Sequence, residues 1–126
     1  MKYLLDVNAL IAWYHGGTPK QRFHAWRAAN APATTYHTCA ITELGFLRVS
    51  MIRYNFTREM AENALALIKR DITGYIDTLP SPTLANWVLS HAQTTDSYLC
   101  QLAAANGMKL ATFDTKITDK AAAIIP

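Results

Sequence analysis

The chain has 126 residues, of which 51% are hydrophobic and 17% charged, and its formal net charge is +3. This composition excludes a disordered chain, supplies enough apolar residues for one globular domain over residues 1–126, and is compatible with a polyanionic partner. No apolar run approaches the roughly 20 residues of a membrane span, and Asp6 and Asn8 interrupt the first apolar run where a signal peptide would be continuous, so we expect a soluble, cytoplasmic protein with no membrane partner.

Short apolar runs and stretches with helical spacing alternate along the chain. In the first part, we expect a strand over 2–5, helices over 9–14 and 18–30, a strand over 33–38, and helices over 39–54 and 57–73. In the second part, we expect a strand over 75–79, helices over 83–91 and 94–105, a strand over 109–113, a short turn or helix over 118–120, and a strand over 121–125. This alternation is typical of parallel βαβ units. The sequence therefore predicts an α/β fold: a parallel sheet of about five strands with about seven helical segments flanking both faces.

Carboxylates follow the predicted strands or begin the predicted helices at four places. Asp6 and Asp114 end strands, Asp96 lies in the first turn of a helix, and Glu43 lies in the second turn of the helix after the second strand. Each has an ordinary structural explanation, because acids favour turns and helix starts, and Glu43 could pair with a nearby Arg or Lys. In an open parallel sheet, however, these positions all lie at one edge. We therefore expect the four acids to converge.

Converging carboxylates repel one another, by on the order of 4 kcal/mol for two charges ~4 Å apart at an effective dielectric near 20. A cation resolves this repulsion, and a set of oxygen ligands favours Mg²⁺ or Mn²⁺ over zinc. Such an ion can activate water and bind the oxygens of a phosphodiester during in-line attack. The acids alone therefore indicate metal-assisted hydrolysis of a negatively charged substrate.

Four segments resemble the motif blocks of PIN-domain proteins, in particular the VapC toxins of bacterial toxin–antitoxin pairs: Leu4–Asn8, Thr42–Arg48, Thr95–Leu99 and Ala111–Asp114. Each block is weak alone, but the ordered set spans nearly the whole chain. The resemblance maps the family's acids onto Asp6, Glu43, Asp96 and Asp114, and its recurrent polar companions onto Asn8 and Thr112. One departure is mild, since Ser97 stands where Ala is commoner after the third acid.

The resemblance implies a PIN fold and a Mg²⁺- or Mn²⁺-dependent endoribonuclease that cleaves structured RNA, often tRNA or rRNA. It implies a homodimer that is inhibited by a cognate VapB-type antitoxin and reaches promoter DNA only through the antitoxin. On this interpretation Asp6, Asp96 and Asp114 hold the metal, and Glu43 binds it directly or through water, or orients the attacking water. Arg48 and Lys116 are candidate phosphate contacts.

Two alternatives remain open at this point. Asp6 and Asn8 form an Asp-x-Asn sequence that superficially resembles haloacid-dehalogenase-like phosphatases, in which Asp6 would be a covalent nucleophile. The chain is short for that class and shows no lid. The second alternative is a PIN-like module that binds a regulatory partner without catalysis, although all four acids are present.

Overall fold

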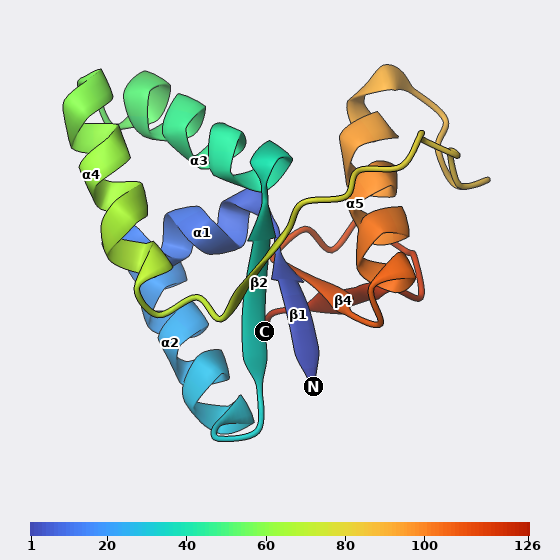
Figure 1. Ribbon diagram of the computed structural model, residues 1–126, viewed down its shortest axis with the longest axis horizontal. Coiled ribbons are helices and arrows are strands. Elements are labelled where there is room, and N and C mark those ends of the chain that lie inside the picture. The colour runs from blue at the N-terminus through green and yellow to red at the C-terminus, as the bar shows by residue number, and fades with distance from the viewer.

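The computed structural model describes all 126 residues, and its centre is a five-stranded parallel sheet. The strand order is β3-β2-β1-β4-β5, so that the first strand lies in the middle (Figure 1). The bounds of the strands are β1 Lys2–Leu5, β2 Thr35–Cys39, β3 Gly74–Ile76, β4 Lys109–Thr112 and β5 Ala122–Ile124. Because all pairings are parallel, the carboxyl ends of the strands lie at one edge of the sheet.

Five α-helices cover the sheet: α1 Val7–Tyr14, α2 Thr18–Asn30, α3 Ala40–Arg53, α4 Arg58–Lys69 and α5 Thr94–Ala105. A 3₁₀ turn, His91–Gln93, precedes α5. None of these helices combines the length and the apolar character that crossing a membrane requires.

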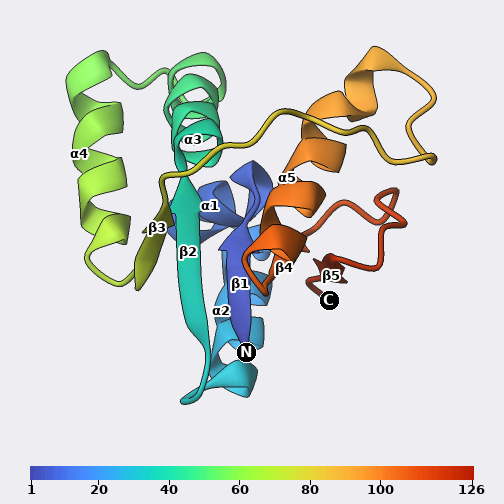
Figure 2. The same ribbon diagram turned by 45° about the vertical axis from the view of Figure 1, so that its right-hand side comes forward.

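The two faces of the sheet are covered by different helices, as the alternation of side chains along β1 requires. Tyr3 and Leu5 point into a core shared with α1, α2, α3 and α4, whereas Leu4 points into a smaller core with Leu99 and Leu102 of α5. Figure 2 shows α5 in front of β1 and β4, with α1 and α2 behind the sheet. The predicted α/β architecture, with helices on both faces, is therefore confirmed.

The helix expected over 83–91 is wrong, and with it the estimate of about seven helices. This segment is an irregular loop with single turns that lies along α5. Two backbone N–H groups that a helix would bond to carbonyls four residues earlier have other partners: Val88 donates to the carbonyl of Ala85 at 3.1 Å, and Leu89 donates to Gln93 Oε1 at 2.7 Å. Such local side-chain acceptors compete with helix formation, and spacing of apolar residues alone does not reveal them.

Helices α1 and α3 approach closely at Gly45, and this contact lies next to the first acid. A Cβ atom added at Gly45 would overlap the side chain of Val7, the residue after Asp6. Val7 is β-branched and has little freedom to move aside. We expect Gly45→Ala to lower the free energy of unfolding by about 1–3 kcal/mol, despite the roughly 1 kcal/mol that Ala gains over Gly in a helix.

Urea-induced unfolding would measure the effect of Gly45→Ala. Gly16→Ala is the matched control, because a Cβ atom at Gly16 meets nothing within 4 Å. Equal stability of the two variants would contradict the close packing of α1 on α3.

Candidate active site

Asp6 is held at the junction of β1 and α1. It caps the N-terminus of α1, where its Oδ1 accepts a hydrogen bond from the N–H of Val7 at 2.7 Å, and its Oδ2 accepts one from Thr112 Oγ1 at 2.7 Å. Only 6% of the residue is exposed. Burial raises the pKa of Asp6, the hydrogen bonds from Thr112 and Val7 lower it in part, and the charge of Asp114 raises it further.

Thr112, the last residue of β4, connects the polar groups around Asp6. Besides donating to Asp6, its fully buried hydroxyl accepts hydrogen bonds from Asn8 Nδ2 and from the N–H of Asp114, both at 3.1 Å. Asn8 Oδ1 in turn accepts the N–H of Phe113 at 3.1 Å. These bonds fix the start of α1 to the loop that carries Asp114.

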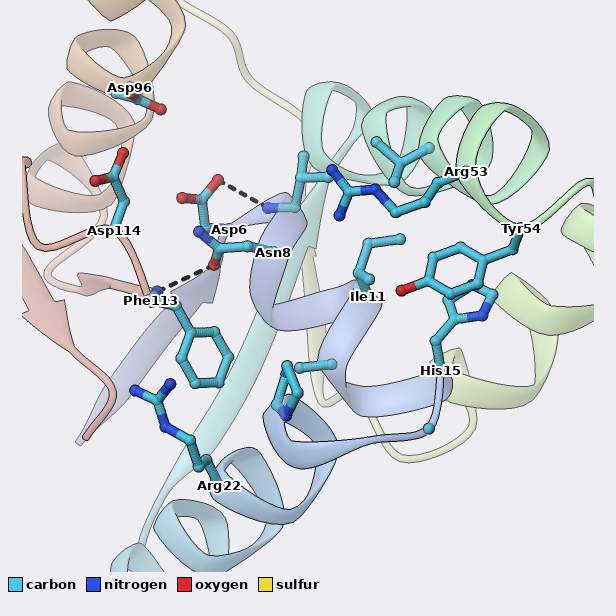
Figure 3. A pocket seen from close by; sticks show the side chains of 15 residues that line it. Asp6, Asn8, Ile11, His15, Arg22, Arg53, Tyr54, Asp96, Phe113 and Asp114 are labelled. Atoms are coloured by element: carbon cyan, nitrogen blue, oxygen red, sulfur yellow. Dashed lines mark hydrogen bonds between the residues drawn. The ribbon is translucent and has the colours of Figure 1, made fainter.

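Asp96 and Asp114 face Asp6 from two other segments of the chain. Asp96 lies in the first turn of α5, and no hydrogen bond is made to its carboxylate; Asp114 follows β4 and accepts the N–H of Lys116 at 2.9 Å. Burial, then the charges of Asp6 and Asp114, raise the pKa of Asp96 to about 6. Figure 3 shows the three carboxylates together on one side of a pocket. The three carboxylates are therefore close enough for their charges to act on one another.

Glu43 lies at the same edge of the sheet but outside this pocket. Its Oε2 accepts a hydrogen bond from Thr38 Oγ1 at 2.6 Å, and its Oε1 lies 3.2 Å from Lys69 Nζ of α4. The structure therefore brings Asp6, Asp96 and Asp114 together and leaves Glu43 paired with a basic residue, as the simple structural explanation of Glu43 predicts.

The pocket has a volume of about 400 Å³ and extends from the carboxylates along α1 to a pair of aromatic rings. Two arginines that were not expected from the sequence also line the pocket: Arg22 from α2 and Arg53 from α3. No motif marks either residue, because only the packing of these helices around α1 brings them to the pocket. The two cations expected from the sequence, Arg48 and Lys116, are exposed and do not line this pocket.

The donor set fits a hard divalent cation, because it offers three carboxylates, and burial together with the neighbouring acids raises the pKa of Asp6 and of Asp96. In the structure, no three Asp, Glu, His or Cys side chains are close enough together to bind one ion directly. Mg²⁺ commonly keeps several waters and contacts only one or two carboxylates. Water ligands or rotated side chains would therefore complete such a site.

Comparison with known proteins identifies the family. The model of the PIN domain family matches residues 3–123. Ribonuclease VapC39 of Mycobacterium tuberculosis is 34% identical over 140 residues, covering 98% of this chain and 96% of the relative. Ribonucleases VapC38 and VapC44 of the same species are 30% and 33% identical, over 90% and 93% of this chain and 86% and 89% of theirs. The chain therefore belongs to the PIN domain family, and within it to the VapC type.

Proposed function

We propose that this chain is a divalent-metal-dependent endoribonuclease toxin that cleaves structured RNA such as tRNA or rRNA. The observation that supports it most is the convergence of Asp6, Asp96 and Asp114 on one pocket, where burial and the two neighbouring charges raise the pKa of Asp96 to about 6. Similar chains named ribonucleases supply the substrate class. The carboxylates and the phosphates of RNA are both negatively charged and repel one another, so a cation is needed between them.

The proposed role of each side chain follows from its position in the site. Asp6, Asp96 and Asp114 would hold Mg²⁺ or Mn²⁺, which supplies a Lewis acid that acidifies water and neutralises charge on the phosphodiester. Thr112 and Asn8 are positioning residues, because their hydrogen bonds hold the Asp6 carboxylate and the Asp114 backbone in place.

Glu43 and the exposed cations have less direct roles in this proposal. Since Lys69 neutralises Glu43, the carboxylate would reach the metal only through water or after rotating away from that lysine. Arg48 and Lys116 remain candidate contacts to phosphates outside the pocket, where exposed cations contribute affinity without sequence preference.

We also propose the partners of a VapC-type toxin: a second copy of the chain, a VapB-type antitoxin that inhibits cleavage, and promoter DNA reached through the antitoxin, all in the cytoplasm. Apolar side chains are exposed on one face of α3, where Leu44, Met51 and Ile52 are 68%, 43% and 74% exposed. Exposed apolar surface of this kind is typical of protein–protein contacts.

The test is cleavage of purified bacterial tRNA and rRNA by the wild type and by Asp6→Asn, with added Mg²⁺ or Mn²⁺ and with EDTA. Asn still accepts the N–H of Val7, so that the helix cap is retained. We expect metal-dependent cleavage that falls by about 100-fold or more in the variant.

The surface substitution Glu62→Gln controls for the change in charge, since the nearest cation to Glu62 is the exposed Arg58 at 3.7 Å. Equal cleavage by wild type and Asp6→Asn would reject the proposal. No cleavage by either would favour a non-catalytic module, and a trapped aspartyl phosphate on Asp6 would favour the phosphatase alternative.

A further inference from the structure

The pocket continues well beyond the three carboxylates. From Asp6 at the start of α1 to His15 just past its end, the helix rises by about 13 Å. Ile11, Ala12 and Val49 line the pocket between these ends. A single phosphate at the carboxylates would leave the far end empty, and a volume of about 400 Å³ is within the range of sites for small organic ligands.

Two stacked rings form the far end of the pocket. The rings of His15 and Tyr54 lie with centroids 3.6 Å apart and planes 10° apart. His15 is buried and fixed by a 3.0 Å hydrogen bond between its Nε2 and Ser50 Oγ. Tyr54 is 37% exposed, and no other aromatic ring or cation covers its opposite face. The pair therefore presents one rigid aromatic surface to the pocket (Figure 3).

The backbone at the end of α3 holds Tyr54 in this position. Its N–H donates to the carbonyl of Ser50 at 3.2 Å, as does the N–H of Phe56. Between them Asn55 has a φ of +55°, the left-handed conformation that commonly ends a helix. The backbone of Tyr54 is thus fixed and its ring is held by the stack on His15, which reduces the entropy lost on binding.

Arg53, the residue before Tyr54, supplies a cation without a partner. It makes no salt bridge and no side-chain hydrogen bond, and Figure 3 shows its guanidinium directed back along the pocket toward Asp6. Arg22 is different, because its guanidinium donates to the carbonyls of Ile125 and Pro126 and lies over the ring of Phe113. Arg53 is therefore the arginine of this pocket that is free to bind an anion.

We propose that His15, Tyr54 and Arg53 form a subsite for one unpaired nucleotide next to the phosphodiester that is cleaved. The base stacks on the open face of Tyr54, and Arg53 contacts the phosphate that links this nucleotide to the carboxylate end. An aromatic face and a cation together are typical of single-stranded nucleic acid recognition. The inference rests on the proposed ribonuclease function and adds that the substrate must present an unstacked base.

Nuclear magnetic resonance titration tests this subsite without requiring turnover. The ligands are the four nucleoside 5′-monophosphates and ribose 5-phosphate, each in the presence of Mg²⁺. We expect the wild type to bind at least one nucleotide about 5- to 100-fold more tightly than ribose 5-phosphate, in line with base stacking on an aromatic side chain. Tyr54→Ala should abolish this preference.

Tyr54→Phe is the matched control, because Phe keeps the ring that stacks on His15 and removes only the hydroxyl. It should keep the preference within about twofold. Arg53→Gln should weaken nucleotides and ribose 5-phosphate equally, since it removes only the phosphate contact. An amide spectrum of each variant confirms that it is folded.

The subsite is rejected if the wild type shows no preference for a base or if folded Tyr54→Ala retains it. This outcome is separable from failure of the proposed function. Base preference without RNA cleavage would keep the subsite and reject the ribonuclease, whereas cleavage without base preference would keep the ribonuclease and reject the subsite.

Discussion

We expect Asp96→Asn to lower RNA cleavage by about 100-fold or more, and at the same time to raise the melting temperature of the metal-free protein at pH 7.5. The Asp96 carboxylate has no hydrogen-bond donor, and the charges of Asp6 and Asp114 act against it. Asn removes the charge and loses no hydrogen bond made by the carboxylate. Opposite changes in activity and stability are the expected result where a site keeps unfavourable charge for function.

The gain in stability should depend on pH in a defined direction. Burial and the neighbouring acids raise the pKa of Asp96 from 3.8 to about 6 in the folded protein. Between these values the folded chain keeps a proton that the unfolded chain releases, so the stability of the wild type falls as the pH rises from 4 to 6. Asn does not titrate. The difference in melting temperature should therefore be small near pH 4 and fully developed above pH 6.

Thermal unfolding in EDTA at pH 4 and pH 7.5, monitored by circular dichroism, measures this difference. Glu62→Gln removes one negative charge from the exposed face of α4 and should not raise the melting temperature at either pH. If Asp96→Asn is no more stable than the wild type at pH 7.5, burial and the neighbouring acids do not destabilise the Asp96 carboxylate as proposed. If Asp96→Asn cleaves RNA as fast as the wild type, Asp96 is not a catalytic residue.

The sequence predicts the fold well where buried strands are followed directly by polar residues. β1 and β4 are short apolar runs that end at Asp6 and just before Asp114, and the parallel register pairs Leu5 with Ala111. Each strand can be predicted from its own apolar run. Because parallel strands have their carboxyl ends at one edge of the sheet, both acids are then expected at that edge. This logic needs no knowledge of distant contacts.

The parts of the site that the sequence does not reveal depend on contacts between segments far apart in the chain. Lys69 of α4 pairs with Glu43 only because α4 packs on α3. The residues around Glu43 in the sequence do not indicate this pairing. Tyr54 and Arg53 reach the pocket because α3 crosses α1 and ends beside His15. A periodic pattern identifies the buried face of a helix, but it does not show which pocket the end of the helix reaches.

The second large effect is expected at Thr112. We expect Thr112→Val to lower the free energy of unfolding by about 2–4 kcal/mol, because it leaves the buried carboxylate of Asp6 and partly buried groups of Asn8 and Asp114 without their partner. Val has nearly the shape of Thr, so little of this loss comes from a cavity. Cleavage should fall by about 10- to 100-fold, as is usual when the support of a metal ligand is removed. Urea-induced unfolding and RNA cleavage measure the two effects.

Thr112→Ser separates the hydroxyl from the methyl group. Ser keeps the hydrogen bonds and loses one methyl group, so its stability should fall by only about 1 kcal/mol and its cleavage should stay near that of the wild type. If Val and Ser were equally impaired, packing and not the hydroxyl would explain the residue. The double variant Asp6→Asn with Thr112→Val tests whether Thr112 acts through Asp6. Thr112→Val should lower cleavage less in the Asp6→Asn background than in the wild type, because the effects of two residues that act through one carboxylate are not additive.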